Sequence, residues 1–296
     1  MTHRMLLDTS SLMYRAYFSH PVSIRDPKGR PVNALHGYLD FTTYLLAVRK
    51  PDEIVHCYDH NWKPDQRVAL YAGYKAQRLP DPEGLPEQFA MLREVLDAFG
   101  LPQAEAPDWE GEDAIGGLCA KPARGERFDI VTGDRDLLQL VHDPAIRVLF
   151  TIKGVRELHE FDEAAVEAKY GMPPSRYADF AILRGDPSDG LPGVRGVGEK
   201  TARALVQAYP SLDELVADAT AERRTKPILQ RSPSLRNTIR ESTDYIAAMK
   251  QVVPIRQDVP VSLWQRDRDD QAIDRLSAEY RIASPVRRLR EVLRPA

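Results

Sequence analysis

Two carboxylates stand directly before a glycine-rich turn in the stretch from Gly185 to Ala202. Ionised Asp186 and Asp189 can only accept hydrogen bonds or bind cations, so they cannot bind a phosphate directly. The turn after them contains three glycines, Gly193, Gly196 and Gly198. Glycines let backbone N–H groups approach a ligand, and a helix that begins near Glu199 would point its positive end at an anion. The stretch predicts a divalent cation beside a phosphate, as phosphodiester cleavage requires.

Seven further acidic residues stand after apolar segments or in tight clusters. The nine candidates together are Asp8, Asp59, Glu110, Glu112, Asp113, Asp134, Asp136, Asp186 and Asp189. Carboxylates brought close together raise one another's pKa, whereas one or two divalent cations convert the repulsion into coordination. Hard oxygen ligands without a Cys or His cluster of zinc spacing favour Mg²⁺ or Mn²⁺. Taken singly, Asp8 and Asp113 can also be helix N-caps, and Asp134 to Asp136 can be a turn.

Short apolar segments alternate with amphipathic segments in the first half of the chain, which is the α/β pattern. We predict strands at Met5–Leu7, Ile54–Tyr58, Phe128–Thr132 and Arg147–Phe150. We predict helices at Leu35–Arg49, Glu87–Phe99 and Asp113–Ala120. Asp8 follows the first strand, Asp59 the second, and Asp134 with Asp136 the third. A parallel sheet brings such residues together at its carboxyl edge, where we expect one acidic site.

Strand signals fade from about residue 161 onward. Helices are predicted there at Asp162–Tyr170, Tyr177–Leu183, Glu199–Tyr209 and Ile239–Val252. We therefore expect an α/β core over residues 1–160 and a helical part over residues 161–296. Residues 63–86 are rich in Pro, Gly and charge, and they are predicted to form a long mobile insertion in the core.

The formal net charge of −3 is unusual for a nucleic-acid binder, because phosphate neutralisation needs Lys and Arg. The distribution explains it, since basic residues dominate positions 223–240 and the tail at 281–294. A solvated helix face is the alternative explanation for each basic run. The 43% hydrophobic and 29% charged content excludes a disordered chain. Cys57 and Cys119 are expected to be small buried hydrophobic residues.

No apolar run approaches the roughly 20 residues that span a bilayer, and the N-terminus carries no secretory signal. We therefore expect a cytoplasmic protein with no membrane partner.

An ordered series of motifs covers nearly the whole chain. They are Leu6-Leu7-Asp8 with Leu12-Met13-Tyr14-Arg15, Tyr58-Asp59, the segment from Tyr71 to Arg78, Trp109-Glu110-Gly111-Glu112-Asp113, the segment from Thr132 to Leu140, and the glycine-rich stretch. This series resembles the 5′ nuclease or flap endonuclease family. The resemblance is closest to the bacterial type, found as the N-terminal part of DNA polymerase I and as free-standing 5′–3′ exonucleases. Because the chain ends at Ala296, we expect the free-standing form.

The resemblance implies a mostly parallel central sheet with helices on both faces, a helical arch at about residues 63–86, and a helix-hairpin-helix element at about residues 185–210. It implies that a first metal ion is bound or surrounded by Asp8, Asp59, Glu110, Glu112, Asp113 and Asp134. Asp136, Asp186 and Asp189 would surround a second. Two divalent cations, at most three, are expected, either Mg²⁺ or Mn²⁺, with a K⁺ ion at the hairpin loop.

Roles for basic and aromatic residues are also implied. Lys75 and Arg78, in the arch, would meet the scissile phosphate as catalytic residues. Tyr71 and Tyr74 would stack on an unpaired base, with core packing as the alternative. The hairpin element would grip duplex backbone through Gly193, Arg195, Gly196, Gly198, Lys200 and Thr201.

Two positions depart from the family pattern. Glu112 stands where the family usually has Asp, and this longer carboxylate can move a metal ion or admit a water. Gly190 stands where the family usually has Asn, and we expect it to alter only the geometry of the turn.

The expected activity is two-metal hydrolysis of DNA, as a 5′-flap endonuclease and 5′–3′ exonuclease, near the junction of duplex and single strand. Expected partners are DNA with a 5′ flap, a nick or a free 5′ end, and RNA-containing 5′ ends. We expect a monomer associated with the bacterial nucleoid that acts in replication and repair. The alternatives are a single-strand ribonuclease of the PIN type, a metal phosphatase, and a catalytically inert protein that binds DNA structures.

Overall fold

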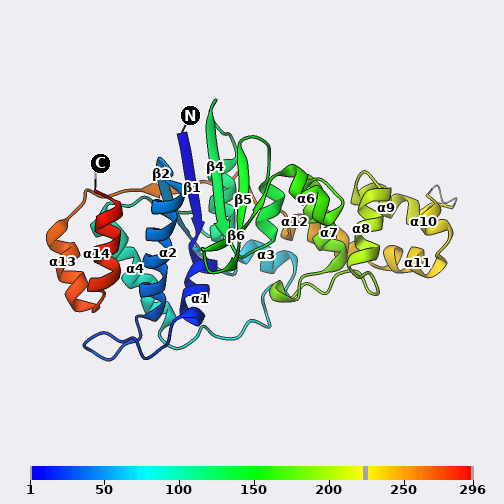
Figure 1. Ribbon diagram of the computed structural model, residues 1–296. Coiled ribbons are helices and arrows are strands. Elements are labelled where there is room, and N and C mark those ends of the chain that lie inside the picture. The colour runs from blue at the N-terminus through cyan, green and yellow to red at the C-terminus, as the bar shows by residue number, and fades with distance from the viewer. Residues whose placement is uncertain (1, 223–225, 295–296) are drawn as a thin grey trace.

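A seven-stranded sheet forms the centre of the computed structural model, which describes residues 2–222 and 226–294 (Figure 1). The strands are β1 (Thr2–Asp8), β2 (Glu53–Tyr58), β3 (Gln103–Glu105), β4 (Glu126–Thr132), β5 (Ile146–Lys153), β6 (Glu157–Phe161) and β7 (Ser262–Trp264). Their order is β6-β5-β4-β1-β2-β3-β7, with five parallel strands between antiparallel edges. The predicted α/β class with a mostly parallel sheet is confirmed.

Side chains of each central strand alternate between two apolar layers, one on each face of the sheet. Met5 and Leu7 of β1 belong to the layer shared with α1 (Thr9–Ser19), α2 (Asn33–Arg49) and α4 (Leu85–Phe99). Leu6, between them, belongs to the layer shared with α5 (Gly111–Cys119) and most of the later helices. This alternation follows from the two-residue period of a strand and explains why residues 5–7 of β1 are apolar on both faces.

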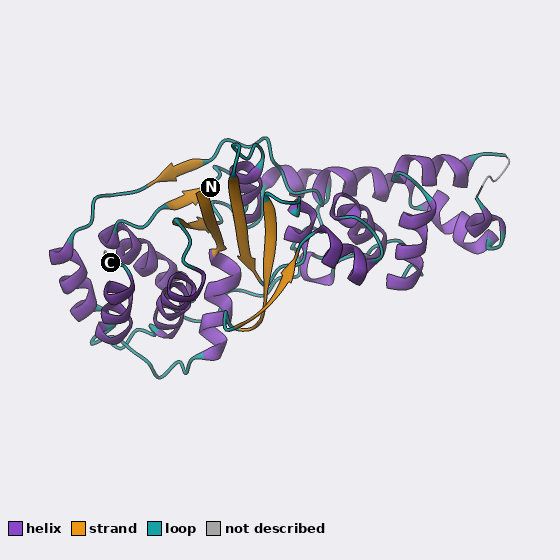
Figure 2. Ribbon diagram, turned by 45° about the horizontal axis from the view of Figure 1, so that its top comes forward, coloured by secondary structure: helices purple, strands orange, loops and turns teal. Residues whose placement is uncertain are grey.

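Most later helices extend away from the sheet, as Figure 2 shows. They are α6 (Glu163–Tyr170), α7 (Tyr177–Arg184), α8 (Glu199–Ala208), α9 (Leu212–Thr220), α10 (Pro227–Gln230), α11 (Pro233–Glu241) and α12 (Thr243–Val252). Three short 3₁₀ helices are η1 (Asp136–Leu140), η2 (Pro174–Arg176) and η3 (Pro187–Asp189). The single helix predicted at Ile239–Val252 is therefore wrong. Two helices meet at Ser242, whose backbone N–H is bonded to both Thr238 and Ile239 at the end of α11.

The last part of the chain returns to the sheet. Strand β7 pairs with β3, and α13 (Asp270–Glu279) and α14 (Ala283–Val292) pack against α4 and α2. Sequence patterns did not predict β3, β6 or β7, because β3 and β7 are only three residues long and β6 lies on an edge of the sheet. The boundary at residue 160 stays a prediction, although residues 262–292 join the layers around the sheet.

Residues 63–86, expected as a helical arch, contain one short helix, α3 (Asp65–Leu70). Residues 72–77 form successive turns, and residues 78–81 have no regular structure before α4 begins. Pro80 and Pro82 explain the irregular part, because proline removes a backbone donor and restricts the residue before it.

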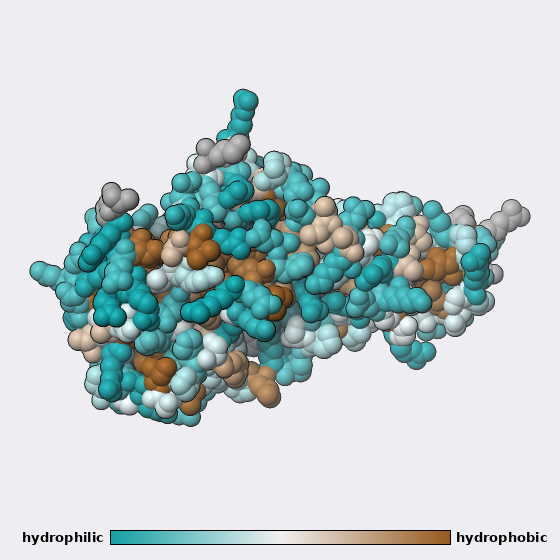
Figure 3. All heavy atoms as spheres, viewed as in Figure 1, coloured by the Kyte–Doolittle hydropathy of each residue, from teal (hydrophilic) through white to brown (hydrophobic). Residues whose placement is uncertain are grey.

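Hydrophilic side chains cover most of the face seen in Figure 3, and the apolar patches between them are separate. The apolar residues gather instead in the two layers on either side of the sheet. Among the helices of residues 2–222 and 226–294, none combines the length and apolar character that a membrane span requires.

Candidate active site and metal centre

The predicted acids meet at the carboxyl edge of the sheet, on the walls of a cavity of about 1490 Å³. Asp8 is the last residue of β1, Asp59 follows β2, and Asp134 follows β4 by two residues. The cavity wall contains six of the nine acids, Asp8, Asp59, Glu110, Glu112, Asp134 and Asp186. The other three contact residues of that wall. Asp113 accepts from the Glu110 N–H, the backbone N–H of Asp136 donates to the Asp134 carboxylate, and Asp189 forms an ion pair with Arg78.

Short hydrogen bonds hold the acids at the strand ends. Asp8 accepts from the backbone N–H of Ser11, which caps α1, and from the hydroxyl of Thr132 at 2.6 Å. Asp59 accepts from Ser10 at 2.7 Å and from the Gly111 N–H at 2.6 Å, at the start of α5. The N-cap alternative for Asp8 is thus also true, because one carboxylate oxygen can accept from a cap and still offer a lone pair.

A buried arginine that sequence reasoning missed organises the acids of α5. Arg67 of α3 is 1% exposed and forms ion pairs with Glu110, Glu112 and Asp113. Its two terminal nitrogens bind Asp113 at 2.9 and 2.8 Å, and its Nε donates to the Val252 carbonyl at 3.0 Å. The only sequence signal was an arginine four residues before Tyr71 in a segment that we expected to be mobile. Arg67 joins the insertion, the acids and α12 in one contact network.

Glu110 and Asp113 accept from several protein donors. Glu110 binds Arg67, the Lys75 ammonium, and the hydroxyl of Tyr74 at 2.6 Å. Asp113 binds Arg67 and the Arg256 N–H at 2.9 Å, and with Glu110 it forms a capping box for α5. The capping alternative for Asp113 therefore describes its geometry. Together with Glu112, these two acids bring one ligand oxygen each within 4.8 Å of one another.

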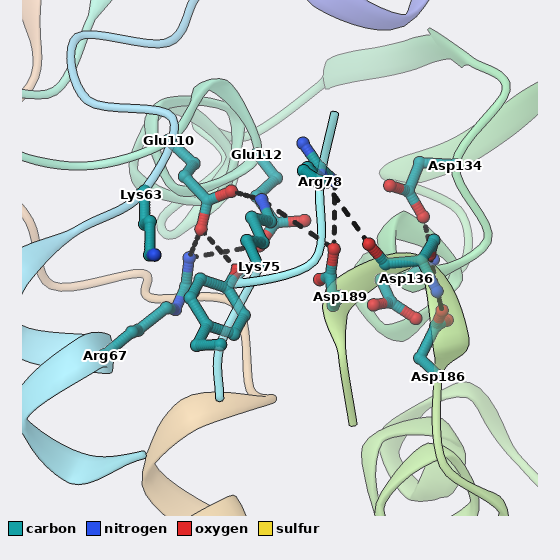
Figure 4. A network of polar contacts seen from close by, with 12 residues as sticks. Lys63, Arg67, Lys75, Arg78, Glu110, Glu112, Asp134, Asp136, Asp186 and Asp189 are labelled. Carbon is teal, nitrogen blue, oxygen red and sulfur yellow. Dashed lines mark hydrogen bonds and ion pairs between the residues drawn. The ribbon is translucent and has the colours of Figure 1, made fainter. Parts of the chain in front are cut away.

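The second group of acids has fewer internal cations (Figure 4). Asp134, Asp136, Asp186 and Asp189 face one another, with Arg78 bonded to Asp189 at 2.9 Å and Arg184 at 3.6 Å from Asp186. One carboxylate oxygen of Asp136, Oδ1, is buried and has no hydrogen-bond partner among the described residues. A buried carboxylate oxygen without a donor, beside three other acids, is the environment that a hard divalent cation satisfies.

Burial and mutual repulsion raise the pKa of acids in both groups. Burial is the main cause for Asp8, whose pKa rises to about 7, with smaller contributions from Asp134 and Asp59. The pKa of Glu112 rises to about 8, again mainly through burial, although Arg67 opposes the change. Burial, Asp134 and Glu112 together hold the pKa of Asp136 well above its ordinary value. Burial therefore disfavours the ionised form of these carboxyl groups, and a bound cation would offset this cost.

The four residues expected in the arch lie in two different environments. Lys75 is 6% exposed and lies between the two acid groups, and Arg78 lies half exposed on the cavity wall. Tyr74 is 2% exposed, and Tyr71 is partly buried edge-on to the ring of Tyr245. The packing alternative, rather than a stacking platform for a base, describes both tyrosines, because their rings lie against the core.

The predicted hairpin residues also differ from one another. Arg195, Gly196, Gly198 and Lys200 are exposed, and Thr201 is half buried in the first turn of α8. Gly193 is different, since its N–H donates to the Tyr245 hydroxyl at 3.0 Å. A side chain at Gly193 would also meet the Arg184 carbonyl at 2.5 Å. Gly193 therefore packs the hairpin against α7 and α12, and its N–H already has a partner within the protein, so a DNA contact at this position stays a prediction.

Two family models match the chain. Residues 3–171 match the model described as 5′-3′ exonuclease, N-terminal resolvase-like domain, and residues 172–275 match 5′-3′ exonuclease, C-terminal SAM fold. A 5′-3′ exonuclease of Streptomyces coelicolor is 41% identical, covering 96% of this chain and 98% of the relative. A 5′-3′ exonuclease of Mycobacterium tuberculosis is 38% identical over 98% of this chain and 97% of the relative.

Solved structures share the fold at lower identity. The T5 D15 protein co-crystallised with metal ions has a TM-score of 0.68 and 13% identity, covering 98% of this chain and 99% of that one. Flap endonuclease-1 from Methanococcus jannaschii has a TM-score of 0.61 and 19% identity over 98% of this chain and 92% of that one. The resemblance inferred from the motifs is confirmed. The chain therefore belongs to the 5′–3′ exonuclease family and is a 5′ nuclease.

Proposed function

We propose that this protein hydrolyses phosphodiester bonds of DNA near the junction between duplex and a 5′ single strand, with two divalent cations. One observation carries the proposal. Six of the nine acids line one cavity and the other three contact its wall, among them Asp136, whose buried Oδ1 has no partner among the described residues. Relatives named T5 D15 flap endonuclease and Rad2 have been solved in complex with DNA, which supports DNA as the substrate class.

The acidic and basic residues of the cavity would have different roles in the reaction. Asp136 and Asp186 would hold one cation, and Asp8, Glu110 and Glu112 the other. Asp134, which the resemblance assigned to the ion of Asp8, accepts from the Asp136 N–H and would join Asp136 instead. Bound cations supply an activated water and charge stabilisation on the phosphate oxygens. Lys75 and Arg78, which share the cavity with the acids, would offset the charge that develops on the transferring phosphate. Acids with raised pKa values would release their protons when cations bind.

The exposed hairpin residues Arg195, Gly196, Gly198 and Lys200 would contact the duplex backbone. Their position at the N-terminus of α8 favours a phosphate, since unpaired N–H groups and the helix dipole point there. We also propose Mg²⁺ or Mn²⁺ as the working ions, a K⁺ ion at this loop, and a monomer at the bacterial nucleoid. RNA-containing 5′ ends are the second substrate class to test.

Cleavage of an end-labelled 5′-flap duplex tests the proposal. The assay compares Mg²⁺, Mn²⁺ and EDTA, with the Lys75→Ala variant in parallel. We expect cation-dependent cutting at the junction, and a kcat that falls about 100-fold in Lys75→Ala while duplex affinity changes little, because the ammonium acts mainly in the transition state. A flap that is bound but uncut with either ion would overturn the proposal in favour of an inert DNA-binding protein.

A further inference from the structure

The segment that carries Lys75 is held against the loop that carries Asp186 and Asp189. We call residues 73–78 the lysine turn and residues 186–190 the acid loop. The backbone N–H of Lys75 donates to the Asp189 carbonyl at 2.8 Å. The Gln77 side-chain amide donates to the carbonyls of Pro187 at 2.8 Å and Ser188 at 3.3 Å. These three acceptors are main-chain carbonyls, and Arg78 at the end of the turn adds a hydrogen bond to the Asp189 carboxylate at 2.9 Å.

The acid loop presents a rigid surface for this contact. Asp186 and Leu191 exchange two backbone hydrogen bonds at 2.9 and 2.8 Å, which close the loop at its base. The Asp186 side chain accepts from the Ser188 N–H at 2.8 Å and from its hydroxyl. The loop therefore has its own internal support, and the Pro187 and Ser188 carbonyls are left pointing toward Gln77.

Gly190 is a position where the two segments leave no room for a side chain. Its φ of +73° is in the left-handed region, and a Cβ built there would lie 2.5 Å from the Gly73 carbonyl and closer still to Oε1 of Gln77. The Gln77 side chain could swing away from such an atom. The Gly73 carbonyl belongs to the main chain, so in this chain a Cβ at 190 would require the lysine turn or the acid loop to shift.

We propose that Gly190 and Gln77 are positioning residues, which hold the lysine turn on the acid loop and so fix Lys75 and Arg78 between the two acid groups before DNA binds. This proposal rests on the proposed function, in which the Lys75 and Arg78 side chains act on the scissile phosphate. Lys75 itself has a φ of +50°, a conformation that is uncommon for a side chain with a Cβ. The backbone contact to Asp189 is what holds it there. The lysine turn thus holds the flexible side chains of Lys75 and Arg78 in one geometry, so less conformational entropy is lost on reaching the transition state.

Substitutions on each side of the contact test the proposal. Gly190→Ala adds the blocking Cβ, and Gln77→Ala removes the two side-chain bonds without changing any glycine. Gly29→Ala is the matched control, because Gly29 also has a positive φ, +83°, but a Cβ there would meet nothing within 4 Å. Melting temperatures are measured for all three variants. The loss in Gly29→Ala shows how much stability an alanine at a positive φ costs when its Cβ meets no neighbour.

The first readout is hydrogen exchange of the Lys75 amide by NMR in metal-free, DNA-free protein. We expect exchange to become about fivefold faster or more in Gly190→Ala and Gln77→Ala, and to stay unchanged in Gly29→Ala. This readout reports the contact directly and needs no cleavage. Unchanged exchange in both variants would overturn the proposal.

The second readout separates kcat from duplex affinity in the flap assay with Mg²⁺. Displacing a cation by about 1 Å can cost about 100-fold in rate, so we expect kcat in Gly190→Ala to fall between about 10- and 100-fold at nearly constant affinity. In a Lys75→Ala background, Gly190→Ala should lower kcat little further, because both substitutions remove the same contribution of the Lys75 ammonium. Fully additive losses would contradict a role exerted through Lys75.

The two readouts distinguish failure of the proposed function from failure of the positioning role. If the unmodified protein cuts no flap, the proposed function fails, while amide exchange still tests the contact. If it cuts normally and neither variant changes kcat, the positioning role fails and the proposed function stands.

Discussion

The two acid groups differ in how their negative charge is balanced. Glu110, Glu112 and Asp113 surround the buried guanidinium of Arg67, and Lys75 adds a second cation to Glu110. In the group around Asp136, Arg78 and Lys75 reach Asp189 at 2.9 and 3.9 Å and Arg184 lies 3.6 Å from Asp186, but one buried oxygen of Asp136 has no partner among the described residues. The first group is thus largely balanced by the protein itself. The second depends more on a cation from solution.

The largest expected effect concerns the balanced group. Arg67→Met keeps much of the side-chain volume but leaves three buried or half-buried carboxylates without their shared cation. Breaking a buried ion pair in this way typically costs about 3–5 kcal/mol, and we expect a loss of that size. Urea unfolding in EDTA measures it.

Arg49→Met is the control for this measurement. Arg49 pairs with Glu160 on the surface, where both side chains are partly exposed, so its loss should cost at most about 1 kcal/mol. Equal losses in the two variants would show that Arg67 does not balance the acids in the way that the contacts indicate.

Asp136→Asn tests the group that needs an external cation. We expect cleavage to fall at least about 100-fold, because a ligand for the cation is lost. The metal-free protein should at the same time become more stable, since the amide has no charge to bury. Flap cleavage with Mg²⁺ and thermal unfolding in EDTA measure the two changes. Asp267→Asn, at an exposed position, is the control and should change neither. A destabilised, fully active Asp136→Asn protein would remove the contrast between the groups.

The pH dependence of stability should show the same contrast. The folded-state pKa values of Asp8 and Glu112, about 7 and about 8, lie above their ordinary values of 3.8 and 4.5. The folded state therefore binds more protons than the unfolded state between pH 4 and 8, and stability falls as pH rises through this window. We expect Tm in EDTA to decrease by several degrees from pH 5 to pH 8.

Mg²⁺ provides the comparison for the pH experiment. A cation that stabilises the ionised carboxylates should lower their pKa and flatten the decrease of Tm with pH. A Tm that rises from pH 5 to pH 8 in EDTA would contradict the raised pKa values.

The smallest expected effect lies outside both acid groups. Lys200→Ala at the start of α8 should lower the slope of log affinity against log salt by about 1, without changing cleavage at saturating DNA. Lys28→Ala, whose ammonium pairs with Glu279, is the control and should leave the slope unchanged. Fluorescence anisotropy at several salt concentrations measures both. A change in kcat for Lys200→Ala would mean that the hairpin also influences the acid groups.

Much of the core could be predicted from periodicity alone. Apolar runs of four to seven residues such as 54–58 and 128–132 are strands because both of their faces are buried, and α4 shows the 3.6-residue pattern of a helix against a sheet. The meeting of Asp8, Asp59 and Asp134 also followed from sequence, since parallel strands end at one edge. The short edge strand β7 could not be predicted, because three residues carry too little pattern to separate a strand from a loop.

The sequence by itself determined the four central strands β1, β2, β4 and β5, the set of acids and the family, because these depend on side-chain type at regular spacing along the chain. Tertiary structure alone decided which cations balance which acids. Arg67 reaches Glu110 and Asp113 across more than 40 positions, and Gln77 reaches the carbonyls of the acid loop across more than 100. Main-chain carbonyls have the same chemistry in every residue, so no residue type marks the acceptor in advance. Only the folded backbone places it.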